Sequence, residues 1–251
     1  MFDEAALRAW LYRERAARDE EALAERIQRL AVKAVRSEWH HNDDDVMLEA
    51  RVWDRLEGEA LGAGVARALR SRFALLTTRE VSALQSRATT KFVLALGDGE
   101  LVETVVMRHA ARTTVCVSSQ VGCAMGCSFC ATGTVGIARD LQAWEIVEQV
   151  LRAQIHERTA AVNVVFMGQG EPLANYGNVS KALTFLTRVL ALRRRSVTVS
   201  TVGVVPALKK LTRDFPEVSL ALSLHAPTQA LRQRIVPSAK RWPLPQLMEA
   251  L

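Results

Sequence analysis

Two hydrophobic periods divide the chain, and the change falls near residue 90. Over residues 4–37, apolar side chains recur every three to four positions among Ala, Leu, Arg and Glu, without Gly or Pro, which predicts a helix. The polar run 40–45 predicts a solvated loop, and the helical pattern resumes over 46–86. We therefore expect a small helical accessory domain over residues 1–89.

Beyond residue 90 the pattern becomes typical of strands. Two apolar runs flank Gly97-Asp98-Gly99, which predicts a β-hairpin over 91–107. Short apolar runs follow at 114–117, 162–167, 197–200 and 218–223, with helical patterns at 141–157, 178–192 and 205–213 between them. Nearly continuous apolar strands indicate that helices cover both faces of a parallel sheet. The predicted fold class is α/β, either an incomplete β/α barrel or an open doubly wound sheet over 90–251.

Composition and charge narrow the class further. The 251 residues are 49% hydrophobic and 24% charged, which excludes collagen-like and wholly disordered chains. Residues 1–90 hold 15 Lys and Arg against 16 Asp and Glu, whereas residues 91–251 hold 18 against 11. The positive charge of the second part is compatible with a polyanionic partner such as RNA. No apolar run is long enough to span a bilayer, and the acidic start favours a cytoplasmic protein, although an organellar address stays open.

Each of the four predicted parallel strands is followed by a polar cluster. The clusters contain Cys123 to Cys130 after the first strand, Gly168 to Pro172 after the second, Ser200-Thr201 at the end of the third and Ser223-Leu224-His225 at the end of the fourth. In β/α folds, the loops at the carboxyl ends of the strands converge and carry the chemistry. The sequence therefore predicts the functional site at this rim.

The four cysteines lie within fifteen residues, which indicates a metal site rather than a disulfide scaffold. Cys123, Cys127 and Cys130 have the spacing C-x3-C-x2-C. Zinc would need a fourth ligand, which Cys116 could supply. Three thiolates on a 4Fe-4S cluster would instead leave one iron open to another ligand. The spacing favours the iron–sulfur cluster without excluding zinc.

Four segments read together resemble one family. They are 112–123, 167–173 (Met-Gly-Gln-Gly-Glu-Pro-Leu), 200–206 (Ser-Thr-Val-Gly-Val-Val-Pro) and 222–227 (Leu-Ser-Leu-His-Ala-Pro). In this order they resemble the RlmN/Cfr family of radical S-adenosylmethionine (SAM) RNA methyltransferases, from about residue 90 to the last residue. The resemblance implies a partial radical-SAM β/α barrel preceded by the helical domain and the hairpin.

The resemblance also implies cofactors, site residues and partners. Cys123, Cys127 and Cys130 would ligate a 4Fe-4S cluster, and the SAM site would be lined by Gly170, Glu171, Ser200, Ser223, Leu224 and His225. Glu103, in a Val-Glu-Thr-Val run, would be the general base, and Cys116 would have a redox or structural role. The implied reaction is methylation of C2 of adenosine in ribosomal RNA of the 23S type and in tRNA. An electron donor such as flavodoxin or ferredoxin would supply the reductant to a monomeric enzyme.

The chain departs from the family in two respects. It has no cysteine after Cys130, whereas the family carries its methyl group on a cysteine near the C-terminus. It also ends at Leu251, before the six βα units of the family are complete, so we expect either a truncated form or a degenerate member, inactive in methylation as given. Two alternatives stay open, a radical SAM enzyme with another substrate and a non-catalytic, metal-stabilised RNA-binding protein.

Overall fold

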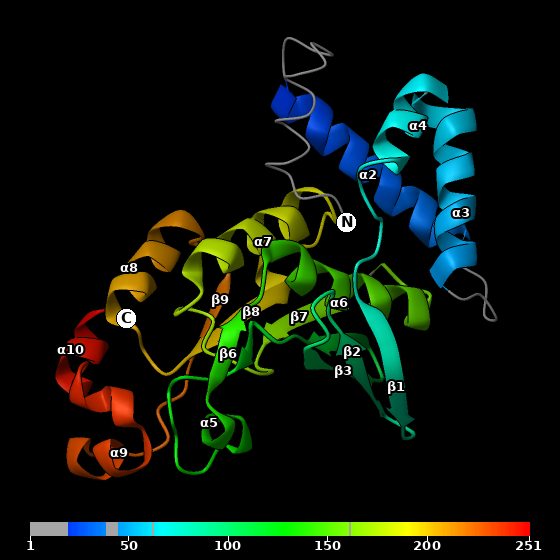
Figure 1. Cartoon of the computed structure of the whole chain (residues 1–251). Helices are drawn as coiled ribbons and strands as arrows, with labels where there is room; N and C mark the ends of the chain where they lie inside the picture. The colour runs from blue at the N-terminus through cyan, green and yellow to red at the C-terminus, as the bar shows by residue number, and fades with distance from the viewer. Residues whose placement is uncertain (1–19, 39–44, 62, 161) are drawn as a thin grey trace.

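The structure is a computed structural model that describes residues 20–38, 45–61, 63–160 and 162–251. Its centre is a seven-stranded sheet with the strand order β1-β2-β3-β4-β7-β8-β9 (Figure 1). The strands are β1 (Arg79–Gln85), β2 (Thr89–Ala95), β3 (Leu101–His109), β4 (Arg112–Cys116), β7 (Val162–Phe166), β8 (Val197–Thr201) and β9 (Ser219–Leu222). Pairs from β1 to β4 are antiparallel and pairs from β4 to β9 are parallel. We call β1–β3 the antiparallel half and β4, β7, β8 and β9 the parallel half.

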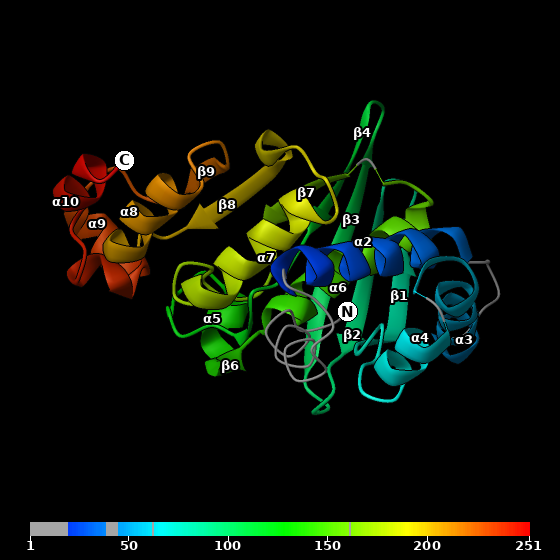
Figure 2. The same cartoon turned by 90° about the horizontal axis from the view of Figure 1, so that it is seen from above.

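The first helices form a small layer beside the sheet. They are α2 (Glu20–Glu38), α3 (Asp45–Arg55), a π-helical turn (Leu56–Leu61) and α4 (Ala63–Arg70). Ile27, Val52 and Leu69 are at most 1% exposed, so each helix buries an apolar stripe. In Figure 2, α2 lies across α6 (Ala143–Glu157), and the Arg36 guanidinium donates to Gln154 Oε1 at 2.8 Å.

The predicted helix over 4–37 is confirmed for the part from residue 20 onward. Residues 4–19, and residues 40–44 of the predicted loop 40–45, lie outside the described residues. The predicted helical pattern over 46–86 is confirmed only as far as residue 70. The division into domains 1–89 and 90–251 stays a prediction.

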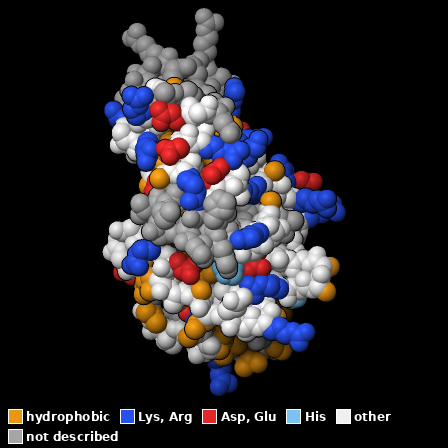
Figure 3. All heavy atoms as spheres, turned by 90° about the vertical axis from the view of Figure 1, so that its right-hand side faces the viewer, with side chains coloured by type: hydrophobic (Ala, Val, Ile, Leu, Met, Phe, Trp, Pro, Cys, Tyr) orange, Lys and Arg blue, Asp and Glu red, His pale blue; other side chains and the backbone are white. Residues whose placement is uncertain are grey.

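The helix prediction is wrong for residues 79–85, which form the edge strand β1. β1 pairs with β2 along its whole length, with a register shift between Glu80 and Ser82. All seven of its residues are exposed, including Val81 at 48% and Leu84 at 65%. On this side of the molecule, apolar side chains gather at the lower end, below a mixture of basic and acidic ones (Figure 3). A strand with no buried face has no alternating hydrophobic pattern, which is why backbone pairing alone reveals it.

The hairpin and the parallel elements are confirmed. β2 and β3 flank the predicted turn, with Val93 opposite Glu103. Helices α6, α7 (Tyr176–Arg188) and α8 (Val205–Asp214) occupy the predicted intervals between the strands of the parallel half. The α/β fold class is therefore confirmed, with β1 and β9 as the two edges of the sheet.

The expectation that helices cover both faces of the parallel sheet is wrong. Along β7 and β8, buried and half-buried residues alternate, so one face packs on the helices and the other is partly open. The strand register shows that this second face continues across β2, β3, β4, β7 and β8, because residues paired between neighbouring strands lie on the same face. We call it the open face, and its half-buried residues include Lys91, Val93, Glu103, Val105, Cys116, Asn163, Val165, Thr198 and Ser200. Apolar β-branched residues on both faces made the strands resemble fully covered ones.

The last segment lies at the β9 end of the sheet. It consists of α9 (Gln229–Ile235), a 3-10 turn (Pro237–Lys240) and α10 (Leu244–Glu249), which follow one another at one end of the molecule (Figure 2). Val236 and Ala239 are buried against Cys127 of the cysteine loop. Within the described residues, we find no helix long and apolar enough to cross a membrane.

Candidate cofactor site at the carboxyl ends of the parallel strands

A two-stranded ribbon carries the cysteine loop. β5 (Gln120–Gly122) pairs with β6 (Ile137–Asp140), and the loop with the short helix α5 (Ala131–Val135) lies between them. Gly122 has φ +77°, and a Cβ there would lie 2.0 Å from the Gly136 carbonyl oxygen. Glycine is therefore required at the point where the chain leaves β5 and enters the loop.

The three cysteines of the motif lie in one loop as free thiols. Cys123 and Cys127 are buried, and Cys130 is half-buried. Burial raises the pKa of Cys127, and the neighbouring thiols of Cys123 and Cys130 raise it further. Burial also raises the pKa of Cys123. Among the described residues, no three His, Cys, Asp or Glu side chains stand in a metal-binding arrangement.

The chemistry of this donor set fits the implied cluster. Thiolates are the ligands that iron–sulfur clusters take, and a turn brings two of these residues together, because Cys130 N–H donates to the Cys127 carbonyl at 3.1 Å. Metal centres bind thiolates, so binding here would displace protons from these thiols. Cys123, Cys127 and Cys130 would hold the cluster.

The loop after β7 is fixed by Glu171, which is 3% exposed. Its carboxylate accepts hydrogen bonds from Leu173 N–H at 3.0 Å, Thr201 Oγ1 at 2.7 Å and Val202 N–H at 2.9 Å. Burial raises the pKa of Glu171, although these hydrogen bonds oppose the rise. The side chain thus joins the end of β7 to the end of β8.

Gln120 joins this loop to the cysteine ribbon. Its Oε1 accepts from Glu171 N–H at 2.9 Å, and its Nε2 donates to Asp140 Oδ1 at 2.6 Å. Gly170 has φ +98°, and a Cβ there would lie 2.6 Å from the Gln120 Cβ. The sequence analysis quoted Gln120 within a motif without giving it a role. Its 2% exposure, visible only in the structure, reveals it as a positioning residue.

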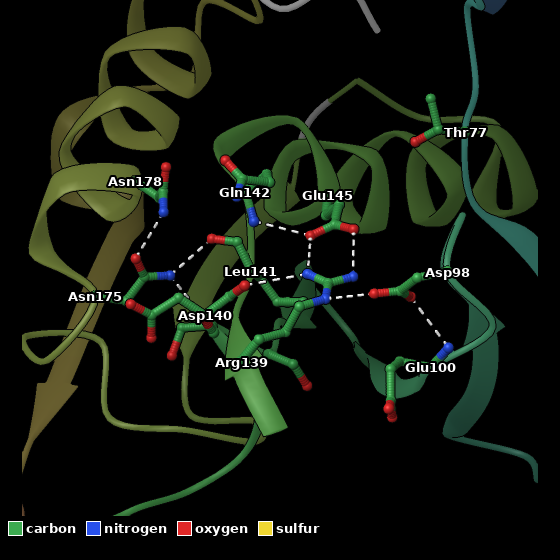
Figure 4. Close-up of polar contacts among 12 residues, drawn as sticks. Thr77, Asp98, Glu100, Arg139, Asp140, Leu141, Gln142, Glu145, Asn175 and Asn178 are labelled. Carbon is green, nitrogen blue, oxygen red and sulfur yellow. Dashed lines mark hydrogen bonds and ion pairs between the residues drawn. The ribbon is translucent and has the colours of Figure 1, made fainter. Parts of the chain in front are cut away.

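The other arm of the ribbon is fixed by Arg139 (Figure 4). Its guanidinium donates to both Glu145 oxygens at 2.8 and 2.9 Å and to Asp98 Oδ2 at 2.6 Å. Glu145 also accepts from Gln142 N–H and completes the capping box of α6. The Asn175 amide donates to the Leu141 carbonyl at 2.8 Å. Both arms of the cysteine loop are therefore anchored to the main fold.

The ends of β8 and β9 bring further predicted residues together. Ser200 Oγ lies 3.2 Å from Ser223 Oγ. His225, with φ +60°, packs against Phe129 of the cysteine loop, with ring centroids 4.4 Å apart and the ring planes tilted by 52°. Burial lowers the pKa of His225, and the charge of Arg232 lowers it further. Leu224 is 38% exposed. These contacts place the β9 loop against the cysteine loop.

Glu103 lies apart from these residues, on the open face of β3. Its carboxylate forms an ion pair with Lys91 at 2.8 Å, and its side chain is 44% exposed. Its link to the rim runs through the backbone, because Ser118 Oγ donates to the Glu103 carbonyl at 2.7 Å and accepts from Gln169 N–H at 3.0 Å. Cys116 lies on the same face, and burial raises the pKa of its thiol.

The sheet and its rim loops together indicate the class of protein. A parallel α/β sheet presents a three-cysteine loop and three polar loops at one rim, and the model of the radical SAM superfamily matches residues 117–243. The chain belongs to the radical SAM superfamily.

Within the superfamily, its relatives are RNA methyltransferases by name. It is 51% identical over 162 residues to a probable dual-specificity RNA methyltransferase RlmN from Synechocystis sp., covering 64% of this chain and 46% of that protein. It is 44% identical over 208 residues to dual-specificity RNA methyltransferase RlmN 1 from Myxococcus xanthus, covering 80% of this chain and 57% of that protein. The chain spans about half the length of the curated relatives it matches. The resemblance to the RlmN/Cfr family is confirmed.

A solved structure extends the similarity to the whole fold. A radical SAM methyltransferase from Sphaerobacter thermophilus superposes with a TM-score of 0.81 at 35% identity, covering 99% of this chain and 70% of that one. The similarity therefore includes the N-terminal helices, which precede the segment that carries the resemblance in the sequence.

Proposed function

We propose that the protein is a radical SAM RNA methyltransferase that acts on C2 of adenosine in ribosomal RNA and tRNA. One observation carries the proposal. The cysteine loop and the loops after β7, β8 and β9 are joined at one rim by Gln120, Glu171 and the contact between His225 and Phe129. The names of the relatives supply the substrate class.

Different residues at this rim would bind the cluster and SAM. Cys123, Cys127 and Cys130 would hold the 4Fe-4S cluster, and cluster and SAM together would supply a 5′-deoxyadenosyl radical. Both Glu171 oxygens already accept hydrogen bonds from the chain, so we assign Glu171 to holding the loop and the backbone at Gly170 to contact with SAM. The hydroxyls of Ser200 and Ser223 and the β9 loop at Leu224 and His225 would line the remainder of the SAM site.

Glu103 is the proposed general base. Its carboxylate is partly exposed on the open face, where an adenine could reach it, and Lys91 holds it in position. Removal of the C2 proton needs a carboxylate within hydrogen-bond reach of that carbon. The buried carboxylate of Glu171 already accepts hydrogen bonds from the chain, which favours Glu103 for this role.

Exposed basic residues would contact the RNA backbone. They are Arg193, Arg194, Arg195, Lys209, Lys210, Lys240 and Arg241. Arg194 also forms a 3.4 Å ion pair with Glu217, so its charge is partly compensated. Phosphate contacts of this kind weaken as salt rises. We further propose a cytoplasmic monomer that receives its electron from a flavodoxin or ferredoxin.

The test is anaerobic incubation of the reconstituted protein with SAM, a reductant, ribosomal RNA and tRNA, followed by mass spectrometry. We expect 5′-deoxyadenosine from the wild type and none from Cys127→Ala. The 251 residues contain no cysteine after Cys130 to carry the methyl group, so we expect C2-methyladenosine only from a longer form that supplies one. Glu103→Gln in that longer form should abolish the product while 5′-deoxyadenosine persists.

Two results would replace the proposal. A loaded protein that binds RNA and never cleaves SAM would favour the non-catalytic, metal-stabilised RNA-binding protein. A protein that cleaves SAM and whose longer form modifies no RNA would favour a radical SAM enzyme with another substrate. Methylated RNA from the 251 residues alone would contradict the need for a later cysteine and would point to Cys116 as the carrier.

A further inference from the structure

Arg232 is a charged side chain that is fully excluded from solvent. It lies on α9, is 0% exposed, and is the bulkiest of the fully buried side chains that the structure describes. Its Nη2 donates to the Val202 carbonyl at 2.6 Å and its Nε to the Leu224 carbonyl at 3.1 Å. Both partners are neutral, and within the described chain no carboxylate pairs with this guanidinium. A buried charge is ordinarily paired with an opposite one, so a negative partner is missing.

The position of Arg232 in the fold indicates where a negative partner would bind. Val202 follows β8 and Leu224 follows β9, so the guanidinium lies between two rim loops. The end of α9 touches the cysteine loop, because Ser128 N–H donates to the Ile235 carbonyl at 3.1 Å. Val236 connects the two, because its N–H donates to the Arg232 carbonyl at 2.8 Å and its side chain packs against Cys127.

We propose that Arg232 is the fixed counter-charge of the thiolate-bound cluster and a determinant of its reduction potential. The proposal rests on the proposed function, because it requires the cluster. Three thiolates give the bound cluster a net negative charge, and reduction adds another. A cation held near the cysteine loop by neutral carbonyls has no carboxylate of the described chain to offset its charge, so it favours binding of the cluster and acceptance of the electron. Arg232 would be a positioning residue with an electrostatic effect and would take no part in the chemistry itself.

The experiment separates charge from hydrogen bonding. Arg232→Gln keeps a donor and removes the charge, whereas Arg232→Lys keeps the charge and changes the donor geometry. Arg234→Gln is the matched control, since Arg234 is an exposed arginine on the same helix. Iron and sulfide per chain are measured in each reconstituted protein, and the midpoint potential is taken from an EPR-monitored redox titration. We expect a more negative midpoint in Arg232→Gln and wild-type values in Arg232→Lys and Arg234→Gln.

Each other result has a defined meaning. Loss of iron from Arg232→Gln with retention in Arg232→Lys would also support the counter-charge. An unchanged midpoint in a fully loaded Arg232→Gln protein would overturn it, and so would equal effects of the Gln and Lys variants, including loss of folding in both. Wild-type protein that binds no iron would instead overturn the proposed function.

Discussion

The two halves of the sheet differ in the exposure and the hydrogen bonding of their polar side chains. At the rim of the parallel half, Gln120 and Glu171 are buried and fully engaged with the chain itself. On the antiparallel half, the Glu103 side chain is 44% exposed, and among the described residues it pairs only with Lys91, whose side chain is 38% exposed. Buried hydrogen bonds fix geometry, whereas an exposed carboxylate can still accept a proton from an incoming ligand. Under the proposed function, positioning would therefore belong to the rim of the parallel half and proton removal to the open face of the antiparallel half.

The largest expected effect is at the ribbon of the cysteine loop. Gly122→Ala would place a Cβ 2.0 Å from the Gly136 oxygen at a residue with φ +77°. Gly99, in the hairpin of the antiparallel half, has φ +89° and open space around it, so Gly99→Ala is the matched control. We expect Gly122→Ala to lower the free energy of unfolding by about 2 kcal/mol more than the control. Urea unfolding measures this difference. Equal losses of unfolding free energy in the two variants would show that the predicted clash with the Gly136 oxygen has no effect.

The next effect tests the role of Glu171 in holding the loops. Glu171→Ala leaves the N–H groups of Leu173 and Val202 and the hydroxyl of Thr201 without their acceptor, which should cost about 1.5 kcal/mol of unfolding free energy. Glu171→Gln keeps an acceptor and should cost less. Calorimetric titration should also show SAM affinity lost in Glu171→Ala. Wild-type stability in the Ala variant would contradict the role.

A smaller, pH-dependent effect lies on the helix-covered side of the antiparallel half. Glu157 accepts two hydrogen bonds from Arg108 at 2.6 and 2.8 Å. Burial raises the pKa of Glu157, but the Arg108 and His156 contacts outweigh it, so the folded-state pKa is lowered. The resulting stability, about 1 kcal/mol, is present above the unfolded value near pH 4.3 and is lost as pH falls through the folded pKa.

Unfolding measured at pH 7 and pH 3 checks this prediction. The stability difference between wild type and Glu157→Gln should shrink as the pH falls. A difference that stays constant between the two pH values would show that the ion pair contributes nothing.

The smallest effect on stability is expected at the proposed base. The ion pair of Lys91 and Glu103 is 38% and 44% exposed, so Glu103→Gln should change the unfolding free energy by less than about 0.5 kcal/mol. Thermal unfolding provides the measurement, with Lys91→Met as the partner variant. A loss comparable to that of Glu171→Ala would mean that both halves use their carboxylates structurally, and the contrast between them would disappear.

Most elements after residue 90 could be predicted, because their apolar runs are short and end at glycine or polar residues. β1 could not, because a strand exposed on both faces leaves no hydrophobic period. The residues of the rim were predictable from their order along the chain, but the bonds of Glu171 to β8 were not. Arg232 was also missed, since an arginine in a polar helical segment indicates a solvated face and only the packing of α9 reveals its burial.

The central claim is that the rim holds a three-thiolate iron–sulfur cluster with one iron open to SAM. The direct measurement is metal analysis and low-temperature EPR of the reduced, anaerobically reconstituted protein, with and without SAM. We predict iron and sulfide in the protein, a cluster signal that SAM alters, and no loss of iron in Cys116→Ser. Stoichiometric zinc that is lost in Cys116→Ser, with no cluster signal, would contradict the account.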